Sequence, residues 1–400
     1  MPILFDKKTQ CCGCGACTAV CPVCAVSLKE DEYGFLYPAI DEEKCIHCNK
    51  CTSVCLYKNK AKTNVPCAAY AGVTGNTDIF KSASGGAFAS VATEFIKNGG
   101  IVFGAVSEIK NNDLYVSHKG AKTLDELDRM LGSKYVQSDT GKAFGTVEKE
   151  LKNGSEVLFS GTPCQVAALK SYLHKDYENL FTIDLICHGV PSQKLFNDYL
   201  HHITDKDEKI KDFVFRDKSR GIVFTSRLIS EANAKTKTQY IHQGTSSFYY
   251  NFLRSSIYRE SCYECKFACQ SRVGDITIGD FWGAKANQSE IIDDSFDPEK
   301  GISCVLVNTD NGNRLIEQYA GRLLTKKTAF DIVAMENEQL KQPSKPSPDR
   351  EALLEAYKND GYKAIEADFR KAVGNRYYVS SLKSKIPAGL KKKIKSILSQ

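Results

Sequence analysis

Two runs of cysteine near the start of the chain constrain its fold more than any other feature. Ten of the 17 cysteines lie between residues 11 and 55, and eight of them form one pattern twice. The spacing is C-x2-C-x2-C-x3-C, and it is made by Cys11, Cys14, Cys17 and Cys21 and again by Cys45, Cys48, Cys51 and Cys55. Thiols two residues apart let a tight loop, with glycine at positions 13 and 15, wrap three corners of a metal cluster. The pattern therefore predicts two cluster-binding loops.

This spacing is the signature of ferredoxin-like units with two [4Fe-4S] clusters, in which the fourth cysteine of each run binds the other cluster. Cluster I is therefore assigned to Cys11, Cys14, Cys17 and Cys55, and cluster II to Cys45, Cys48, Cys51 and Cys21. Cys12 and Cys24 are surplus, and Cys12 leaves the register of the first ligand open by one residue. Leu56 stands where the usual motif has proline.

Zinc and disulfide bonds are the alternatives for so many cysteines. Structural zinc takes four ligands around a tetrahedron, typically as two separated pairs rather than two close triplets. A disulfide framework requires an oxidising compartment, but the start of the chain, MPILFDKK, has neither a long apolar core nor a small-residue cleavage site. We therefore expect iron–sulfur clusters in a cytoplasmic protein.

The composition is that of a soluble globular protein. At 400 residues the chain is long enough for about two or three domains. It is 42% hydrophobic and 26% charged, and it has no apolar run that predicts a transmembrane segment. The formal net charge is +6, but each thiolate-bound cluster carries about −2, so three clusters would bring the charge near zero. The basic balance therefore does not indicate a nucleic-acid partner.

Beyond the cysteine runs the hydrophobic pattern becomes that of an α/β protein (α+β overall). Four parts are expected: a two-cluster ferredoxin-like unit at 1–60, α/β parts at 66–155 and 156–310, and a helical extension at 311–400. Strands are expected at 68–73, 101–106, 157–159, 182–186 and 302–307, and antiparallel strands at 213–215 and 223–229. Helices are expected at 85–98, 143–151, 165–173 and 192–201. A short basic amphipathic helix is expected at 390–398.

Three local features of the α/β parts carry chemistry. The run SASGG, at 82–86, opens a helix whose free N–H groups suit a phosphate or a flavin edge, although Gly-Gly also simply caps loops. The run GSKY, at 132–135, precedes another helix, and Lys134 is by default a solvated lysine. Cys164 and Cys187 each stand just past the carboxyl end of a strand, the edge at which open α/β sheets bind ligands.

Six motifs in this order resemble a known family. They are the ferredoxin unit, SASGG, GSKYVQS, LFSGTPCQVAALK, DLICHGVPS and CYECKFACQSRVGDITIGDFWG. Over about residues 5–310 the chain resembles the coenzyme F-420 hydrogenase/dehydrogenase beta-subunit family, in its bacterial branch with an N-terminal two-cluster ferredoxin unit. The resemblance implies FAD in a flavin-binding α/β domain, and a third [4Fe-4S] cluster beside it.

The resemblance also assigns residues. Two segments match the flavin loops of the family: Ser84, Gly85 and Gly86, and then Ser133, Lys134 and Tyr135. Four cysteines match its additional cluster: Cys164, Cys187, Cys262 and Cys265. Cys269 matches no residue with a role in the family.

These features predict an iron–sulfur flavoprotein oxidoreductase. A ferredoxin-like partner would exchange electrons with the N-terminal unit, and FAD would act on a hydride carrier or a small reducible substrate. Lys134 and His188 are the candidate catalytic residues. Lys134 would interact with the flavin ring. His188 would act as a proton donor, and the alternative for it is a structural histidine at a helix start. The runner-up function is a non-catalytic electron-transfer subunit that feeds a partner enzyme. A zinc-stabilised scaffold is the third.

Overall fold

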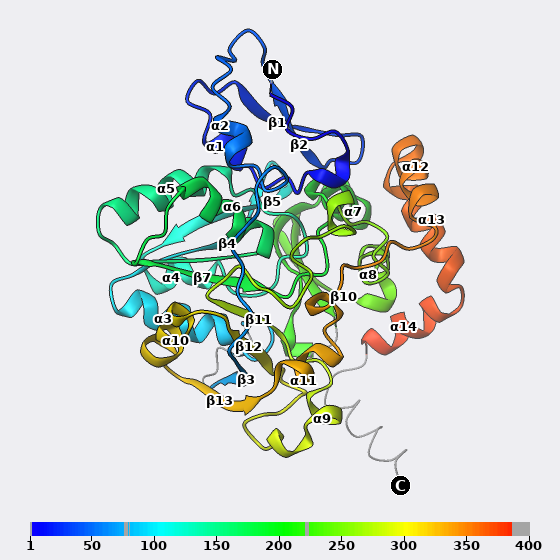
Figure 1. The fold of residues 1–400 in the computed structure, drawn as a ribbon. Helices are drawn as coiled ribbons and strands as arrows, with labels where there is room; N and C mark the ends of the chain where they lie inside the picture. The colour runs from blue at the N-terminus through cyan, green and yellow to red at the C-terminus, as the bar shows by residue number, and fades with distance from the viewer. Residues whose placement is uncertain (1, 76–78, 80, 221–223, 386–400) are drawn as a thin grey trace.

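An eight-stranded mixed sheet forms the centre of the computed structural model, which describes residues 2–75, 79, 81–220 and 224–385 (Figure 1). In sheet order its strands are β13 (Leu323–Thr328), β3 (Ala68–Thr74), β12 (Ser303–Val307), β11 (Ile276–Asp280), β7 (Leu180–Leu185), β6 (Val157–Gly161), β4 (Ile101–Lys110) and β5 (Asp113–Ala121). The inner strands β11, β7, β6 and β4 run parallel, and the outer pairings are antiparallel. The helix expected at 390–398 lies outside the described residues.

Alternating side chains along the inner strands send hydrophobic groups to both faces of the sheet. Val102, Leu158 and Phe181 pack against α3 (Ala87–Lys97) and α10 (Asp310–Tyr319). On the opposite face the neighbouring residues Phe103, Phe159 and Leu180 pack against α5 (Gly141–Lys152) and α6 (Pro163–Leu173). Burial on both faces is what the short, continuously apolar strands predict, and the result is a three-layer α/β sandwich.

The sheet takes strands from three of the expected parts. Its neighbours β3 and β12 come from 66–155 and 156–310, so these parts share one sheet. The outermost strand, β13, comes from the expected helical extension. As an edge strand it has only one buried residue, and the polar run TKK within it masks the strand pattern in the sequence. The other helices near this edge are α9 (Ala284–Asn287) and α11 (Phe330–Met335), and α4 (Leu124–Asp128) follows β5.

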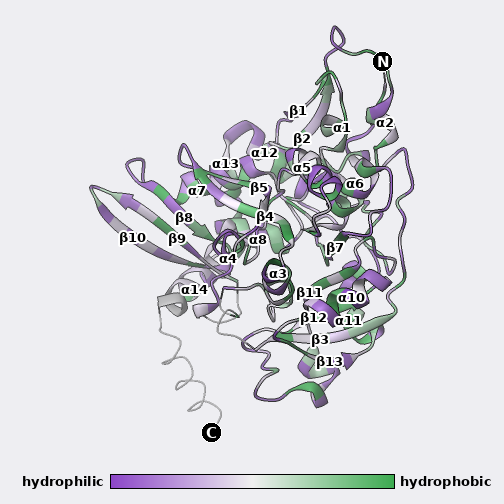
Figure 2. Ribbon diagram, turned by 90° about the vertical axis from the view of Figure 1, so that its left-hand side faces the viewer, coloured by the Kyte–Doolittle hydropathy of each residue, from purple (hydrophilic) through white to green (hydrophobic). Residues whose placement is uncertain are grey.

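A second, three-stranded antiparallel sheet stands beside the large one (Figure 2). It contains β8 (Lys209–Val214), β9 (Thr225–Ala232) and β10 (Lys235–His242). The first two strands confirm the antiparallel pair expected from the sequence. The third strand, β10, was not expected, because half of its residues are exposed and it lacks alternating hydrophobic residues.

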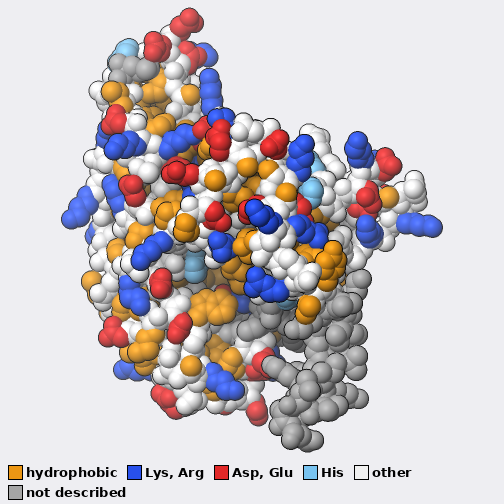
Figure 3. Space-filling view, turned by 90° about the vertical axis from the view of Figure 1, so that its right-hand side faces the viewer, with side chains coloured by type: hydrophobic (Ala, Val, Ile, Leu, Met, Phe, Trp, Pro, Cys, Tyr) orange, Lys and Arg blue, Asp and Glu red, His pale blue; other side chains and the backbone are white. Residues whose placement is uncertain are grey.

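The N-terminal unit projects from one end of the molecule (Figures 1 and 3). It contains an antiparallel hairpin, β1 (Val26–Glu30) and β2 (Leu36–Ile40), and two one-turn helices, α1 (Ala16–Ala19) and α2 (Lys50–Ser53). Ala16, Val54 and Leu56 belong to the same hydrophobic core as α5 and α6. Leu56, the departure from the usual proline, is thus a buried contact between this unit and the α/β part. A ferredoxin-type unit followed by a mixed α/β region confirms that much of the expected fold class.

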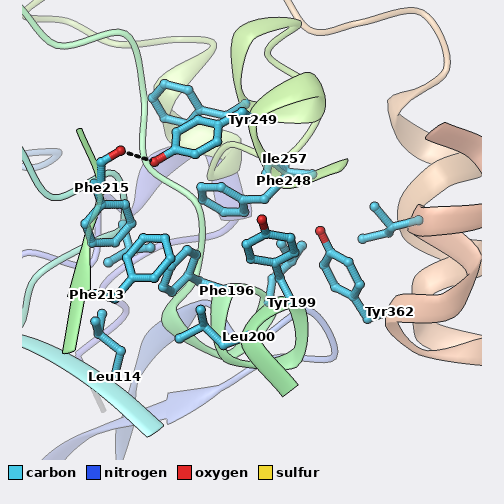
Figure 4. Packing of buried hydrophobic residues seen from close by; sticks show 14 of the residues in the cluster. Leu114, Phe196, Tyr199, Leu200, Phe213, Phe215, Phe248, Tyr249, Ile257 and Tyr362 are labelled. Atoms are coloured by element: carbon cyan, nitrogen blue, oxygen red, sulfur yellow. Dashed lines mark hydrogen bonds between the residues drawn. The ribbon is translucent and has the colours of Figure 1, made fainter. Parts of the chain in front are cut away.

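An aromatic core lies under the three-stranded sheet and the C-terminal helices (Figure 4). Phe196, Tyr199 and Phe248 pack within it, and the Tyr249 hydroxyl donates a hydrogen bond to the Phe215 carbonyl. The helices around it are α7 (Gln193–Ile203), α8 (Ser247–Leu253), α12 (Arg350–Asp360) and α13 (Tyr362–Val373), and α14 (Arg376–Lys385) follows. None of the helices in the described parts of the chain has the length and apolar character needed to span a bilayer.

Candidate functional site

A cavity of about 940 Å³ opens at the carboxyl ends of the parallel strands. Gly104 and Ala105 in the middle of β4, and residues that end β6, β7 and β11, line it together with the loops at 82–84 and 132–138. The far wall comes from 336–339 and from Gln342, Ser344 and Lys345. This is the edge at which open α/β sheets bind ligands, and the volume lies within the range of cofactor sites.

Four cysteines line one end of this cavity: Cys164, Cys187, Cys262 and Cys265. Cys164 lies in the first turn of α6 rather than just ahead of the helix expected at 165–173. The helix starts earlier, at Pro163, because Thr162 and Gln165 form a capping box. Cys187 follows β7, and Cys262 and Cys265 lie on the loop ahead of β11. The chain thus brings together the four cysteines expected for the third cluster.

These thiols are buried and close enough to influence one another. Burial raises the pKa of Cys262 to about 12, and the neighbouring thiols of Cys265 and Cys164 add to the rise. Burial also raises the pKa of Cys265 to about 11, again with a contribution from Cys164. Because a metal binds thiolates, loading this site must release protons, and the bound metal must compensate their mutual repulsion.

A fifth cysteine, Cys12, also lines the cavity. Its side chain is hydrogen-bonded to Cys164 and to Cys14, so it lies between the N-terminal unit and the four-cysteine group. Cys12 is surplus in the ferredoxin pattern, and no sequence motif signals this contact. Cys12 thus lines the cavity, and it directly follows Cys11, an assigned ligand of cluster I.

The two cysteine loops of the N-terminal unit share one backbone conformation. Gly13 and Gly15 have positive φ angles of 62° and 72° in the first loop, and His47 and Asn49 have 53° and 58° at the equivalent positions of the second. Each loop then enters a one-turn helix, α1 or α2. Left-handed residues at the same two positions curl both loops around a common centre.

The structure brings cysteines of the two runs close to one another. Burial, and then the nearby thiols of Cys11 and Cys55, raise the pKa of Cys17 to about 12. Cys21, Cys45, Cys48 and Cys51 line a separate small cavity of about 20 Å³. No three His, Cys, Asp or Glu side chains among the described residues lie close enough to share a single metal ion. A cubane differs from such a site because each thiolate binds its own iron at a separate corner. All 17 cysteines are free thiols.

The two expected flavin segments differ in what they present to the cavity. Ser84, Ser133, Lys134 and Tyr135 line it, whereas Gly85 and Gly86 are not among the lining residues. A Cβ at Gly85 would lie 2.2 Å from the Gly72 carbonyl oxygen, and one at Gly86 would lie 2.6 Å from the Thr74 side chain. These glycines therefore let the loop pack on the sheet behind the cavity. The loop backbone at these glycines lies close to β3 and β12, not to the cavity.

Lys134 is held by the backbone rather than by solvent. Its ammonium group donates to the carbonyl oxygens of Met130 at 2.8 Å and Leu131 at 2.9 Å, and lies 3.2 Å and 3.3 Å from those of Arg129 and Gly132. Burial lowers the pKa of Lys134 to about 7. Tyr135 packs against Phe252, with ring centroids 5.0 Å apart. The two residues thus fix the wall of the cavity next to α4.

His188 lines the cavity, and its side chain is exposed there. Its backbone carbonyl accepts a hydrogen bond of 2.6 Å from the Ser344 hydroxyl. This bond ties the 336–345 segment, where the sequence contains no chemical motif, across the end of β7. The expected extension at 311–400 therefore contributes to the site.

Sequence reasoning missed two further groups in the cavity wall. Asp280 and Trp282 lie in the DITIGDFWG run, to which no role was given, and Arg216 pairs with Asp280 at 2.8 Å. The Arg216 guanidinium also lies 5.7 Å from the Trp282 ring centroid. The second group is His118, which is buried and stacks on Phe159. Only the position of Asp280 and Trp282 at the end of a strand could have pointed to the first group, and no sequence pattern marks His118.

Comparisons with known proteins agree on both parts of the chain. Residues 154–329 match the family model for the C terminus of the coenzyme F420 hydrogenase/dehydrogenase beta subunit, and residues 10–59 match that of the 4Fe-4S dicluster domain. No curated protein matches the chain. A chain of the xenon-derivatised F420-reducing [NiFe] hydrogenase complex from Methanosarcina barkeri is 16% identical, over 78% of this chain and 94% of that chain, with a TM-score of 0.40. This last likeness is too distant to carry an argument. Over residues 154–329 the chain thus resembles the coenzyme F420 hydrogenase/dehydrogenase beta-subunit family, and a 4Fe-4S dicluster domain precedes this region.

Proposed function

We propose that the protein is an iron–sulfur flavoprotein oxidoreductase. It would pass electrons between a ferredoxin-type partner and a hydride carrier or small reducible substrate, with two [4Fe-4S] clusters in the N-terminal unit, a third beside the cavity, and FAD within it. One observation carries the proposal: the four-cysteine group and the segments at Ser84 and Ser133–Tyr135 line the same cavity.

The cavity residues suit FAD in size and chemistry. Its volume of about 940 Å³ is at the upper end of the usual range for cofactor sites. Ser84 and Ser133 add polar side chains to the lining. Lys134, whose pKa lies near 7, adds an amine that carries a positive charge when protonated, and such a charge tunes a flavin when it lies near the ring nitrogens. A bound flavin would supply the conversion between two-electron hydride chemistry and one-electron transfer.

The cysteines suit iron–sulfur clusters by their donor type and grouping. Clusters I and II would be held as the crossed sets given above, and the third by the four cysteines that line the cavity. Four thiolates also suit zinc. Iron is favoured at this position because zinc has no redox chemistry to offer beside a flavin.

His188 is proposed as the proton donor to the substrate. Its exposed side chain lines the cavity, and the Ser344 bond to its carbonyl fixes the backbone from which it extends. The alternative, a structural histidine ahead of α7, requires only the backbone contact. The two roles differ in their effect: loss of a donor lowers kcat, and loss of a backbone support lowers stability.

A second function is favoured by the family description, which names the beta subunit of a hydrogenase or dehydrogenase. In that case the chain would be an electron-transfer subunit, and a partner enzyme would carry out the substrate chemistry. An isolated chain that is reduced through its clusters but turns over no hydride carrier would support this second function.

Binding of FAD by the isolated chain tests the proposal. Protein purified without oxygen should carry or take up about one FAD per chain, because one cavity of cofactor size is lined by both segments. Ser133→Trp would fill the cavity and should weaken FAD binding about tenfold or more, by displacing the ligand from its contacts. Asn153→Trp, at an exposed position outside the cavity, should leave binding unchanged. A parent chain that neither carries FAD nor takes it up would contradict the proposal.

A further inference from the structure

Arg259 joins the N-terminal unit to the α/β part and is fully buried, with 0% of its surface exposed. Its Nε donates to the Cys11 carbonyl oxygen at 2.7 Å, and its Nη2 donates to that of Leu36 at 2.7 Å. Nη1 donates to Oε1 of Gln137 at 3.1 Å. Nη2 also lies 3.9 Å from Sγ of Cys11, and the guanidinium carbon lies 4.1 Å from the Tyr37 ring centroid. These partners are neutral groups and one cysteine sulfur.

The other buried arginines of the described chain are each neutralised. Their ion pairs are Arg216 with Asp280 at 2.8 Å, Arg272 with Asp184 at 2.9 Å, and Arg350 with Glu260 at 3.0 Å. Within the described residues, Arg259 has no carboxylate at ion-pair distance. The adjacent carboxylate in the sequence, that of Glu260, is the one that pairs with Arg350.

A buried cation without a counter-ion is strongly unfavourable. Transfer of an isolated charge into a medium of low polarity costs many kcal/mol, and native proteins therefore pair buried charges or bind an ion to them. Arginine does not escape the cost by losing its proton, because its pKa is too high. The Arg259 site is therefore electrostatically incomplete, and the group that completes it must be an anion next to Cys11.

The geometry points to Arg259 as the built-in counter-ion of the cluster held by Cys11, Cys14, Cys17 and Cys55, and as the residue that raises its reduction potential. The inference rests on the proposed function, since it requires a cluster at this position. Arg259 acts as a positioning residue: its charge and its N–H group are aimed at a ligand sulfur, and no substrate contact is involved.

The direction of the effect follows from the charges. A thiolate-bound cubane carries about −2 when oxidised and gains one further negative charge on reduction. A fixed positive charge attracts the reduced state more strongly, so it makes reduction easier. Because Arg259 is buried, dissolved ions screen this attraction far less than that of a surface lysine.

The charge also belongs to the α/β part rather than to the N-terminal unit. The Arg259 amide donates to the Val190 carbonyl at 2.9 Å, and the Arg259 carbonyl accepts from the Cys262 amide at 2.9 Å. Docking of the N-terminal unit on the α/β part therefore sets the potential of its first cluster. The same backbone contacts tie Arg259 to a cysteine of the third group.

A redox titration of the full chain, followed by electron paramagnetic resonance, tests the inference. The signal of cluster I is the one that changes in a Cys55→Ser chain. In Arg259→Gln its potential should fall so that the ratio of reduced to oxidised cluster drops about tenfold at a fixed potential, a shift of about 59 mV for one electron. In Arg259→Lys, which keeps the charge, the ratio should stay close to that of the parent.

Gln137→Glu guards against a failure of Arg259→Gln to fold. It keeps the arginine and adds a carboxylate where Oε1 now accepts from Nη1, so it neutralises the charge, and the potential should fall in the same direction. Lys8→Met is the matched control. Lys8 also lies near the Tyr37 ring, at 5.6 Å, but it is partly exposed and already paired with Asp31 at 2.7 Å.

The outcomes separate the inference from the proposed function. A lower potential in Arg259→Gln or Gln137→Glu, unchanged at high salt and absent in Lys8→Met, supports the inference. Loaded clusters whose potential stays at the parent value in the charge-neutralising variants would overturn it. A parent chain that takes up no iron at Cys11, Cys14, Cys17 and Cys55 would instead contradict the proposed function.

Discussion

At the scale of single residues, His118 is a neutral, buried histidine that holds part of the cavity wall by hydrogen bonds. Its Nε2 lies 2.9 Å from the Ser160 carbonyl oxygen, which only accepts, so this nitrogen carries the proton. Nδ1 accepts from the Ser138 hydroxyl at 3.1 Å, and Ser138 in turn accepts from the Gln165 amide at 2.9 Å. The neutral ring thus satisfies every member of a buried network. A second proton on the ring would break it.

This network predicts a specific loss of stability in acid. Burial lowers the pKa of His118 from its ordinary 6.5 to about 4. Because the folded state holds the ring neutral, the stability it contributes is complete above pH 6.5 and is lost as the pH falls toward 4. Between pH 7 and pH 5 the loss should be about 2 kcal/mol. In His118→Gln this part of the pH dependence should disappear.

Chemical denaturation of the parent and His118→Gln at both pH values, without cofactors, measures the difference. The titration of all other groups is common to the two chains and cancels in the comparison. Equal changes in the free energy of unfolding between pH 7 and pH 5 would show that His118 is not the group responsible.

The type of a residue alone does not show what surrounds it in the fold. In the sequence, the glycines at 85 and 86 suggest space for a ligand, but in the fold that space is filled by the Gly72 carbonyl and the Thr74 side chain. A glycine signals a close approach without saying what approaches. Lys134 is by default a solvated lysine, and its carbonyl partners follow from no sequence rule. No sequence pattern marks Arg259, because its proposed role depends on the absence of a nearby carboxylate in the fold.

At the scale of elements, hydrophobic periodicity predicts the buried part of the fold. The strands β4, β6, β7 and β12 and the helices that cover them are predicted to within a few residues, because both sides of each strand are buried. The inner strand β11 was not expected, although it lies between β7 and β12. The edge strands β13 and β10 were not expected, because exposed strands need few hydrophobic residues. The order of strands in the sheet comes from long-range pairing, which no local pattern contains.

The four cysteines of the cavity come from three different elements, so their grouping is a property of the fold. Three clusters require about twelve irons per chain and two require about eight. Cys265→Ser should therefore lower the iron content by about four, because a cubane that loses a thiolate is bound weakly. Cys269→Ser, four residues away on the same loop, should leave the iron content unchanged. Iron analysis of anaerobically prepared protein, with zinc measured in parallel, checks this.

About eight irons and one zinc in the parent chain would contradict the third cluster and would leave the two N-terminal clusters in place. The comparison is sharp because Cys265 and Cys269 share the loop but only Cys265 lines the cavity.

At the scale of the whole molecule, the N-terminal unit is placed between solvent and the cavity. Its outer end carries the exposed Cys48 and the exposed Ile46, and its inner end carries Cys12 in contact with Cys164. Leu56 and Arg259 fix the docking, the first by packing and the second by hydrogen bonds to the Cys11 and Leu36 carbonyls. The N-terminal unit is therefore packed directly against the part of the molecule that forms the cavity.

Under the proposed function the N-terminal unit is the entry point for electrons to FAD in the cavity, and this is the central claim. The direct measurement is the rate at which reduced ferredoxin or viologen reduces the FAD in the cavity, in the parent and in a chain with Cys14→Ser and Cys48→Ser. Cys24→Ser, an exposed cysteine of the same unit assigned to neither cluster, is the control. We predict that the double variant keeps its FAD but is reduced about tenfold or more slowly, a barrier increase of about 1.4 kcal/mol, while the control matches the parent. Equal rates in all three chains would contradict the account, since electrons would then reach the cavity without the N-terminal clusters.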